Sequence, residues 1–72
     1  MGENNTVFKK ISELGLANKC NVGLSFLTSG NLYISVIDNK TYNSDFTIIN
    51  SDCAEELIID VIKDTIRRAK EV

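Results

Sequence analysis

Apolar residues recur every three or four positions along the last third of the chain, from Ser51 to Lys70. That spacing is the period of an α-helix, and it places the apolar side chains on one arc about 200° wide. A helix that lies on a single surface needs an arc of only about 100°, so a second element should cover part of this one. Asp52 followed by Glu55 has the spacing of a capping box, which predicts a helix start at Ser51 or Asp52.

A shorter helical repeat lies near the beginning of the chain. Its apolar members are Val7, Phe8, Ile11 and Leu14. Asn5 or Thr6 stands where an N-cap is expected, and Gly15 stands where a left-handed residue commonly ends a helix. The pattern predicts a short helix of about ten residues, with residues 1–4 frayed.

Between the two helices the apolar positions alternate with polar ones, which is the period of a half-buried β-strand. The alternation covers residues 22–27, 32–37 and 41–49. The segments between them, 28–31 and 38–40, are rich in Gly, Asn, Ser and Asp, which favour tight turns. Three strands joined by tight turns predict an antiparallel meander.

The alternation also predicts which side chains share a face of the sheet. The inner face, toward the helices, is expected to carry Val22, Leu24, Phe26, Leu32, Ile34, Val36, Phe46 and Ile48, with Tyr42 on the same side of the third strand. The outer face is expected to carry Ser25, Leu27, Tyr33, Ser35, Ile37, Asn43, Asp45 and Thr47. The predicted fold is α+β in the order αβββα, a single two-layer domain of residues 1–72 with both helices packed on one face of the sheet.

The composition narrows the possible partners. A domain of 72 residues buries only about 60% of its unfolded surface, so its stability should be marginal or supported by a partner. The net charge of −2 offers no general attraction to phosphate backbones, which disfavours nucleic acid. No run of 18 apolar residues exists, and the N-terminus lacks a basic region followed by an apolar one. We therefore expect a cytoplasmic protein that does not bind membranes.

Few residues in the chain are suited to catalysis or metal binding. Cys20 and Cys53 are the only cysteines and histidine is absent, so one chain cannot supply the four Cys or His ligands of a structural zinc site. In a reducing compartment both thiols should be free and buried, with a disulfide as the alternative. No nucleophile motif or glycine-rich phosphate loop is present. We predict that the protein is not an enzyme and has no cofactor.

The predicted element order resembles that of the double-stranded-RNA-binding domain, and this resemblance implies RNA binding as an alternative function. That family contacts RNA through its first helix, the loop between its first two strands and a lysine-rich start of its last helix. At the last of these places this chain carries acidic residues, within the segment 51–56. Carboxylates repel phosphate, so the topology can be shared without the function.

The chain is also similar to small proteins of phages and mobile elements, including some type II-A anti-CRISPR inhibitors. The similarity lies in size, acidic pI, an Asn, Ile and Lys bias and the element order. It implies an inhibitor or regulator that binds a host protein and occludes it. Because the resemblance is one of architecture, no functional residue carries over from it.

The sequence thus predicts a non-enzymatic protein-interaction module, with two surfaces that could bind the partner. Uncharged polar groups around exposed apolar ones are typical of a protein contact surface. The candidate residues are Leu27, Tyr33 and Ile37 on the outer sheet face, and Asp52, Glu55 and Glu56 at the start of the last helix. Self-association is the competing prediction, because the wide helical arc and the open edges of a three-stranded sheet could both be covered in a homodimer.

Overall fold

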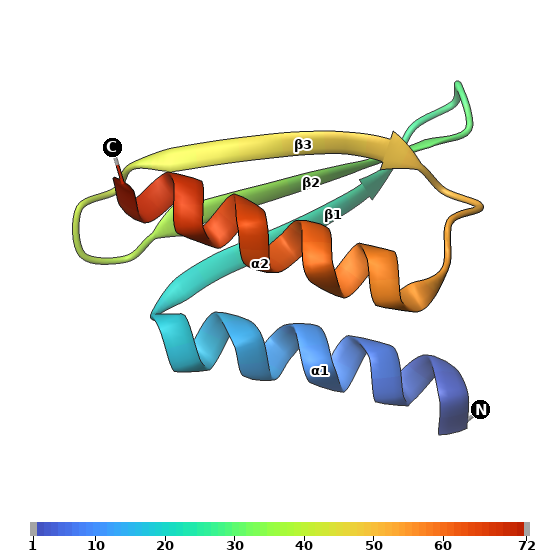
Figure 1. Cartoon of the computed structure of the whole chain (residues 1–72), viewed down its shortest axis with the longest axis horizontal. Helices are drawn as coiled ribbons and strands as arrows, with labels where there is room; N and C mark the ends of the chain where they lie inside the picture. Colours follow the sequence, from blue (N-terminus) through green and yellow to red (C-terminus); the bar gives the residue numbers. More distant parts are fainter. Residues whose placement is uncertain (1, 72) are drawn as a thin grey trace.

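The computed structural model describes the backbone of residues 2–71 and the side chains of residues 7–71. The elements are α1 (Gly2–Asn18), β1 (Cys20–Phe26), β2 (Asn31–Asp38), β3 (Ser44–Asn50) and α2 (Glu55–Glu71). The strands form one antiparallel sheet in the order β1-β2-β3, and both helices pack on the same side of it (Figure 1). The predicted two-layer αβββα fold is confirmed. Within residues 2–71, neither helix has the length and apolar character needed to span a membrane.

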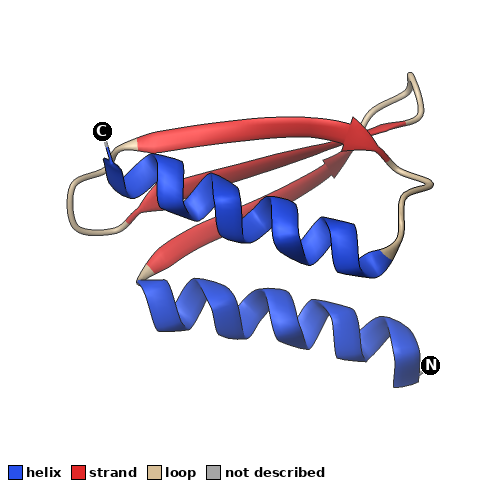
Figure 2. Ribbon diagram, in the orientation of Figure 1, coloured by secondary structure: helices blue, strands red, loops and turns tan. Residues whose placement is uncertain are grey.

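The hydrophobic core lies between the central strand and the two helices. α2 packs across β2 and β3, whereas α1 contacts β1, from which it diverges, and the side of α2 (Figure 2). The wide apolar arc of α2 is explained by these two neighbours. The buried apolar residues are Ile11, Cys20, Leu32, Ile34, Val36, Ile62, Ile66 and Ala69.

Helix α1 is longer than the sequence predicted. It does not end at Gly15 but continues for three more residues, and Lys19 takes the left-handed conformation after it, with φ of 56°. Gly15 has a different role, since a Cβ atom at this position would lie 2.9 Å from the carbonyl oxygen of Cys20. The missing side chain lets α1 approach the first residue of β1.

The beginning of α1 also differs from the prediction. Residues 2–4 are helical rather than frayed, and the expected caps, Asn5 and Thr6, lie inside the helix. Each residue added to an existing helix gains one backbone hydrogen bond, so a helix can extend past a good capping residue. Met1 lies outside the described residues.

The β1–β2 turn agrees with the sequence. The Leu27 N–H donates to the Asn31 carbonyl at 2.8 Å, and the Gly30 N–H donates to the Leu27 carbonyl at 3.0 Å. Gly30 has a φ of 89°, a conformation that residues with a side chain rarely adopt. The glycine therefore serves the turn as predicted.

The β2–β3 turn is longer than predicted and changes the third strand. The Tyr42 N–H donates to the Asp38 carbonyl at 2.8 Å, and the Asp38 N–H donates to the Asn43 carbonyl at 2.9 Å. Tyr42 lies in this loop with a positive φ of 62°, and its side chain is exposed. The prediction that Tyr42 belongs to the inner face of a strand is therefore wrong, and β3 begins only at Ser44.

The faces of β3 are the reverse of the predicted ones. The register places Thr47 beside Ile34 and Asp45 beside Val36, so Asp45 and Thr47 lie on the inner face. Phe46 and Ile48 lie on the outer face and are largely exposed. The sequence was ambiguous here because Ile48 and Ile49 are adjacent. Either phase of the strand, meaning either assignment of its alternate residues to the two faces, points one isoleucine inward.

Phe26 was also predicted to be part of the core, but it lies at the end of β1 and is 73% exposed.

Helix α2 begins at Glu55, three to four residues later than predicted. The N–H groups of Leu57 and Ile58 donate to the carbonyl of Ala54, the residue directly before the helix, so neither Ser51 nor Asp52 is the cap. The hydroxyl of Ser51 instead donates to the Gly30 carbonyl at 2.7 Å. Ser51 thus joins the β3–α2 connection to the β1–β2 turn, which explains why it is not available to cap the helix.

Asp38 holds the β2–β3 turn with its side chain, which is almost fully buried. Its carboxylate accepts a hydrogen bond from the Thr41 hydroxyl at 2.9 Å and one from the Lys40 N–H at 3.3 Å. The Lys70 ammonium of α2 lies 3.5 Å away. The bond from Thr41, then that from Lys40, and the charge of Lys70 together hold the pKa of Asp38 below its ordinary value of 3.8.

We predict that Gly15→Ala destabilises the protein. Alanine is the better helix former by about 1 kcal/mol, but its Cβ would press on a backbone oxygen that can move only if β1 moves. The net loss should be about 1–2 kcal/mol in urea denaturation. Ser12→Ala, at an exposed position of the same helix, is the control and should be neutral or slightly stabilising. A Gly15→Ala protein more stable than the wild type would contradict the close approach.

We predict that Asp38→Asn lowers stability at neutral pH but not in acid. The pKa of Asp38 is lower in the folded state than its unfolded value of 3.8, so the ionised carboxylate stabilises the fold above that pH. The contribution is lost as the pH falls through the folded-state pKa. Urea midpoints of the two proteins should therefore differ at pH 7 and approach each other as the pH falls below 3.8. A gap that stays constant over this range would show that the charge is not responsible.

Candidate interaction surface

The face of the sheet opposite the helices is uncovered, and apolar side chains gather on it. The strand pairing places Tyr33 opposite Ile48, and Ser35 opposite Phe46. Phe46 is 53% exposed and Ile48 is 48% exposed. Leu27 directly follows β1 and continues the same alternation. We call the following residues the outer patch: Leu27, Tyr33, Ile37, Phe46 and Ile48.

Two aromatic rings form the centre of the outer patch. Tyr33 of β2 and Phe46 of β3 stack with their centroids 5.3 Å apart and their planes inclined by 15°. Tyr33 is partly buried, so it supports the more exposed ring beside it. Stacked rings of this kind lose little conformational freedom on binding. The sequence predicted Tyr33 as part of this surface and missed Phe46, because the phase of β3 was assigned the wrong way round.

The rest of the outer face is small, polar and uncharged. Gly23 of β1 has no side chain, and a Cβ atom at this position would lie 2.8 Å from the hydroxyl oxygen of Ser35. No side chain therefore projects from the sheet at this point of β1. None of the residues that the strand pairing places on this face is charged. The remaining members of the face are Asn21, Gly23, Ser25, Asn31, Ser35, Ser44 and Asn50.

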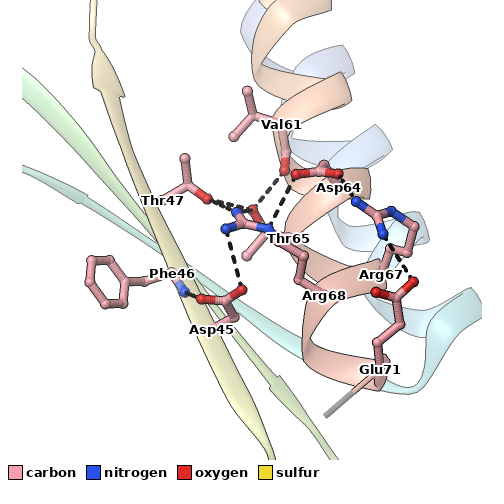
Figure 3. A network of polar contacts seen from close by, with 9 residues as sticks. All are labelled: Asp45, Phe46, Thr47, Val61, Asp64, Thr65, Arg67, Arg68 and Glu71. Atoms are coloured by element: carbon pink, nitrogen blue, oxygen red, sulfur yellow. Dashed lines mark hydrogen bonds and ion pairs between the residues drawn. The ribbon is translucent and has the colours of Figure 1, made fainter.

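A polar network on the inner side of β3 explains the orientation of the outer patch (Figure 3). The Arg68 guanidinium donates to the hydroxyl of Thr47, which lies 2.9 Å from the hydroxyl of the fully buried Thr65. Thr65 in turn donates to the Val61 carbonyl at 2.7 Å. Asp45 Oδ2 lies 3.4 Å from Arg68 Nη1. Since neighbouring side chains of a strand alternate, Phe46 and Ile48 must then point outward.

The cations at the end of α2 are paired with acids. Arg68 Nε lies 3.2 Å from Asp64 Oδ2, an ion pair without hydrogen-bond geometry. Arg67 donates to Asp64 at 2.5 Å and to Glu71 at 2.9 Å, and Lys70 lies beside Asp38. The bond from Arg67 lowers the pKa of Asp64, and the same bond raises the pKa of Arg67. These pairs are mostly exposed and add little stability, but they neutralise the basic end of the helix.

The predicted acidic surface lies in the helical layer, away from the outer patch. Asp52 is in the turn before α2, and Glu55 and Glu56 are in its first turn. All three are exposed, and within residues 7–71 none of their carboxylates makes an ion pair or hydrogen bond. Acids at a helix N-terminus interact favourably with the helix dipole, which accounts for Glu55 and Glu56 without a ligand. The structure therefore does not bring the two predicted surfaces together.

Both cysteines are free, as the sequence predicted. Cys20 is buried and its Sγ lies 3.4 Å from the Asn18 carbonyl, as a weak hydrogen bond. Cys53 is only partly buried, so the prediction that both thiols are buried is wrong for this residue. Across the described part of the chain, no group of three or more His, Cys, Asp or Glu side chains is placed to hold a metal ion.

Comparisons of this chain with protein-family models, with curated proteins and with solved structures found no match.

The two adjacent isoleucines of β3 provide a test of its phase. We predict that Ile49→Thr costs about 1–2 kcal/mol more stability than Ile48→Thr, because Ile49 packs against the core whereas Ile48 is half exposed. The two variants are matched, since the substitution, the strand and the strand propensity are the same. Urea denaturation measures both. The opposite order of stability would mean that β3 has the phase predicted from the sequence.

Proposed function

We propose that this chain is a non-enzymatic protein-interaction module that binds a protein partner through the outer patch and acts by occluding the partner's surface. One observation carries the proposal: exposed apolar side chains are contiguous on a sheet face that bears no charge and that neither helix covers. Contiguous apolar surface is unfavourable in water, and on soluble proteins it commonly marks an interaction site. The proposal assigns no chemical reaction to the chain.

The chemistry of the face favours one kind of partner. Aromatic and aliphatic residues at the centre, surrounded by uncharged polar groups, resemble the core and rim of a protein interface. Tyr33 and Phe46 are the side chains most suited to carry the binding energy, because they are aromatic, central and already held together. The partner should present a mainly apolar surface. Because the face contributes no charge, binding should depend little on salt concentration.

The partner that we propose is a host protein, and the chain would act as an inhibitor or regulator of the kind that phages and other mobile elements encode. The acidic pI and the αβββα architecture support this proposal. Inhibition by occlusion needs a stable surface rather than a catalytic site. A sheet face held rigid by a polar network behind it is suited to that task.

Nucleic acid is the second candidate, and one observation favours it. Phe46 joins Tyr33 on the outer face, and paired aromatic rings on a sheet can stack with unpaired bases. The same face offers no cation to contact phosphates, and Arg67, Arg68 and Lys70 are already paired with acids. The start of α2, where double-stranded-RNA-binding domains are basic, carries Glu55 and Glu56. Protein binding is therefore the better supported function.

The test is an affinity pull-down from a bacterial lysate, with and without nuclease, repeated with single variants. We expect Tyr33→Ala and Phe46→Ala each to weaken binding of the captured protein by about 30-fold, the effect of losing an interface residue worth about 2 kcal/mol. Tyr42→Ala is the matched control, because Tyr42 is an exposed tyrosine outside the outer patch. It should bind like the wild type.

Further outcomes separate the alternatives. A partner whose binding is lost in Glu55→Lys but retained in Tyr33→Ala and Phe46→Ala would show that the acidic start of α2 is the contact surface. Material that disappears on nuclease treatment would favour the nucleic-acid function instead. Capture that does not change in any of these variants would contradict the proposal. Circular dichroism of each variant shows that the fold is retained.

A further inference from the structure

One edge of the sheet is open and unprotected. β1 pairs only with β2, and its register runs from Cys20 to Phe26 without a bulge. Proteins usually protect edge strands with charged side chains, proline, a bulge or a covering element. β1 contains no charged residue and no proline. α1 packs against the inner side of β1, and its closest approach is near the beginning of the strand, where a Cβ atom on Gly15 would lie 2.9 Å from the Cys20 carbonyl oxygen and 3.5 Å from the Val22 side chain.

The hydrogen bonds at both ends of β1 show which peptide groups face outward. The Asn39 N–H donates to the Lys19 carbonyl at 3.0 Å, and the Leu27 N–H donates to the Asn31 carbonyl at 2.8 Å. Bonds of an antiparallel pair involve alternate residues, so the odd-numbered residues of β1 bond to β2. The even-numbered residues direct their N–H and C=O groups away from the sheet. After Cys20, the residues of β1 whose N–H and C=O groups face outward are Val22, Leu24 and Phe26.

An apolar stripe of α1 runs beside this edge. Phe8, Ser12 and Leu16 lie on successive turns of the helix and line a groove of about 860 Å³ with Val22. Phe8 is 57% exposed and Leu16 is 77% exposed. From residue 8 to 16 the helix rises about 12 Å, and residues 22–26 of a strand span about 13 Å. The stripe and the open edge therefore have matching lengths, and Figure 2 shows α1 and β1 diverging from their common connection.

The opposite edge of the sheet is protected. The carboxylate of Asp45 accepts a hydrogen bond from the Phe46 N–H at 2.8 Å, and Phe46 is one of the residues whose peptide groups face outward from β3. That N–H is therefore already used, and a negative charge lies beside it. Two copies of β3 would bring two such charges together. The open edge of the molecule is thus that of β1.

We propose that two copies of this chain pair β1 with β1, antiparallel about a two-fold axis, and form one continuous six-stranded sheet. A second β1 offers outward N–H and C=O groups at the same spacing. With Leu24 opposite Leu24 of the other copy, Val22 of each copy pairs with Phe26 of the other. The same axis sets the two α1 helices antiparallel on the same side of the joined sheet, and Phe8, which lies with Leu24 and Phe26, is near the axis in both copies.

The charge of the groove suits a second copy as the occupant. Only Lys19 is charged among the residues that line the groove, so two copies meet with little repulsion. A stable interface needs about 600 Å² from each chain, roughly an eighth of the 4975 Å² that one chain exposes. The pairing would also cover Phe8, Leu16 and Phe26, which are the large apolar side chains that the small core leaves exposed at this edge.

The dimer is independent of the function proposed above. It uses the edge of the sheet and leaves the outer patch of each copy exposed on the same face. Two outer patches on one rigid sheet would bind a partner that has two equivalent sites more tightly than a single copy could. Loss of the dimer would therefore remove this avidity but not binding itself.

The test combines sedimentation equilibrium with amide hydrogen exchange on the full chain. We expect a mass twice the 8.0 kDa of one chain at high concentration and dissociation on dilution. In the dimer, exchange at Val22, Leu24 and Phe26 should slow with rising concentration. The outward amides of β3, at Ser44 and Ile48, should not change. This period-two pattern on one edge separates edge pairing from contact through either face.

The variant is the double substitution Phe8→Glu with Leu16→Glu, which should raise the dissociation constant at least about 100-fold by placing acids on both sides of the axis. Tyr42→Glu is the control and should dimerise like the wild type. A monomer at 1 mM would overturn the proposal, as would a dimer that resists the double substitution. So would a dimer lost in Phe46→Ala but not in the double variant, since the outer patch would then be the contact. If the double variant does not fold, the exchange pattern of the wild type decides.

Discussion

The hydrogen-bonded chain from Arg68 through Thr47 and Thr65 to the Val61 carbonyl is the constraint on which the rest of the structure depends. Each hydroxyl in it both accepts and donates, so no polar group of the threonines is left unsatisfied in the core. Because the chain joins β3 to α2, it determines which face of β3 points toward the helices. A strand with the other phase would bury Phe46 but remove the partners that β3 supplies, which are Thr47 for the Thr65 hydroxyl and both Thr47 and Asp45 for the guanidinium.

The same constraint separates polar from apolar surface across the sheet. Asp45 and Thr47 lie on the helical side of the sheet, where Arg68 contacts both of them. Phe46 and Ile48 therefore lie on the outer face, beside Tyr33. Within residues 7–71, charged side chains therefore lie in the helices, in the turns and on the helical side of the sheet. An uncharged, partly aromatic face opposite a charged layer is an arrangement suited to protein contact.

The two edges of the sheet differ for related reasons. On β3 the Asp45 side chain reaches the neighbouring N–H, so the residue that contributes to the inner network also closes the outer edge. Within the described residues, no side chain of β1 accepts a hydrogen bond from an outward N–H group of that strand, and the closest approach of α1 is at the beginning of the strand, near Gly15. A core with few large side chains from α1 leaves Phe8 and Leu16 next to the open strand. Face and edge are thus distinct surfaces that can act at the same time.

The sequence by itself determined the number, order and type of the elements, because periodicity and turn residues such as Gly30 are local properties of the chain. It also placed Leu27, Tyr33 and Ile37 on the outer face. Only the tertiary structure decided the phase of β3 and hence the place of Phe46. Adjacent isoleucines made both phases acceptable locally, and the groups that chose between them, on Thr65 and Arg68, are 18 and 21 residues away from Thr47 in the chain.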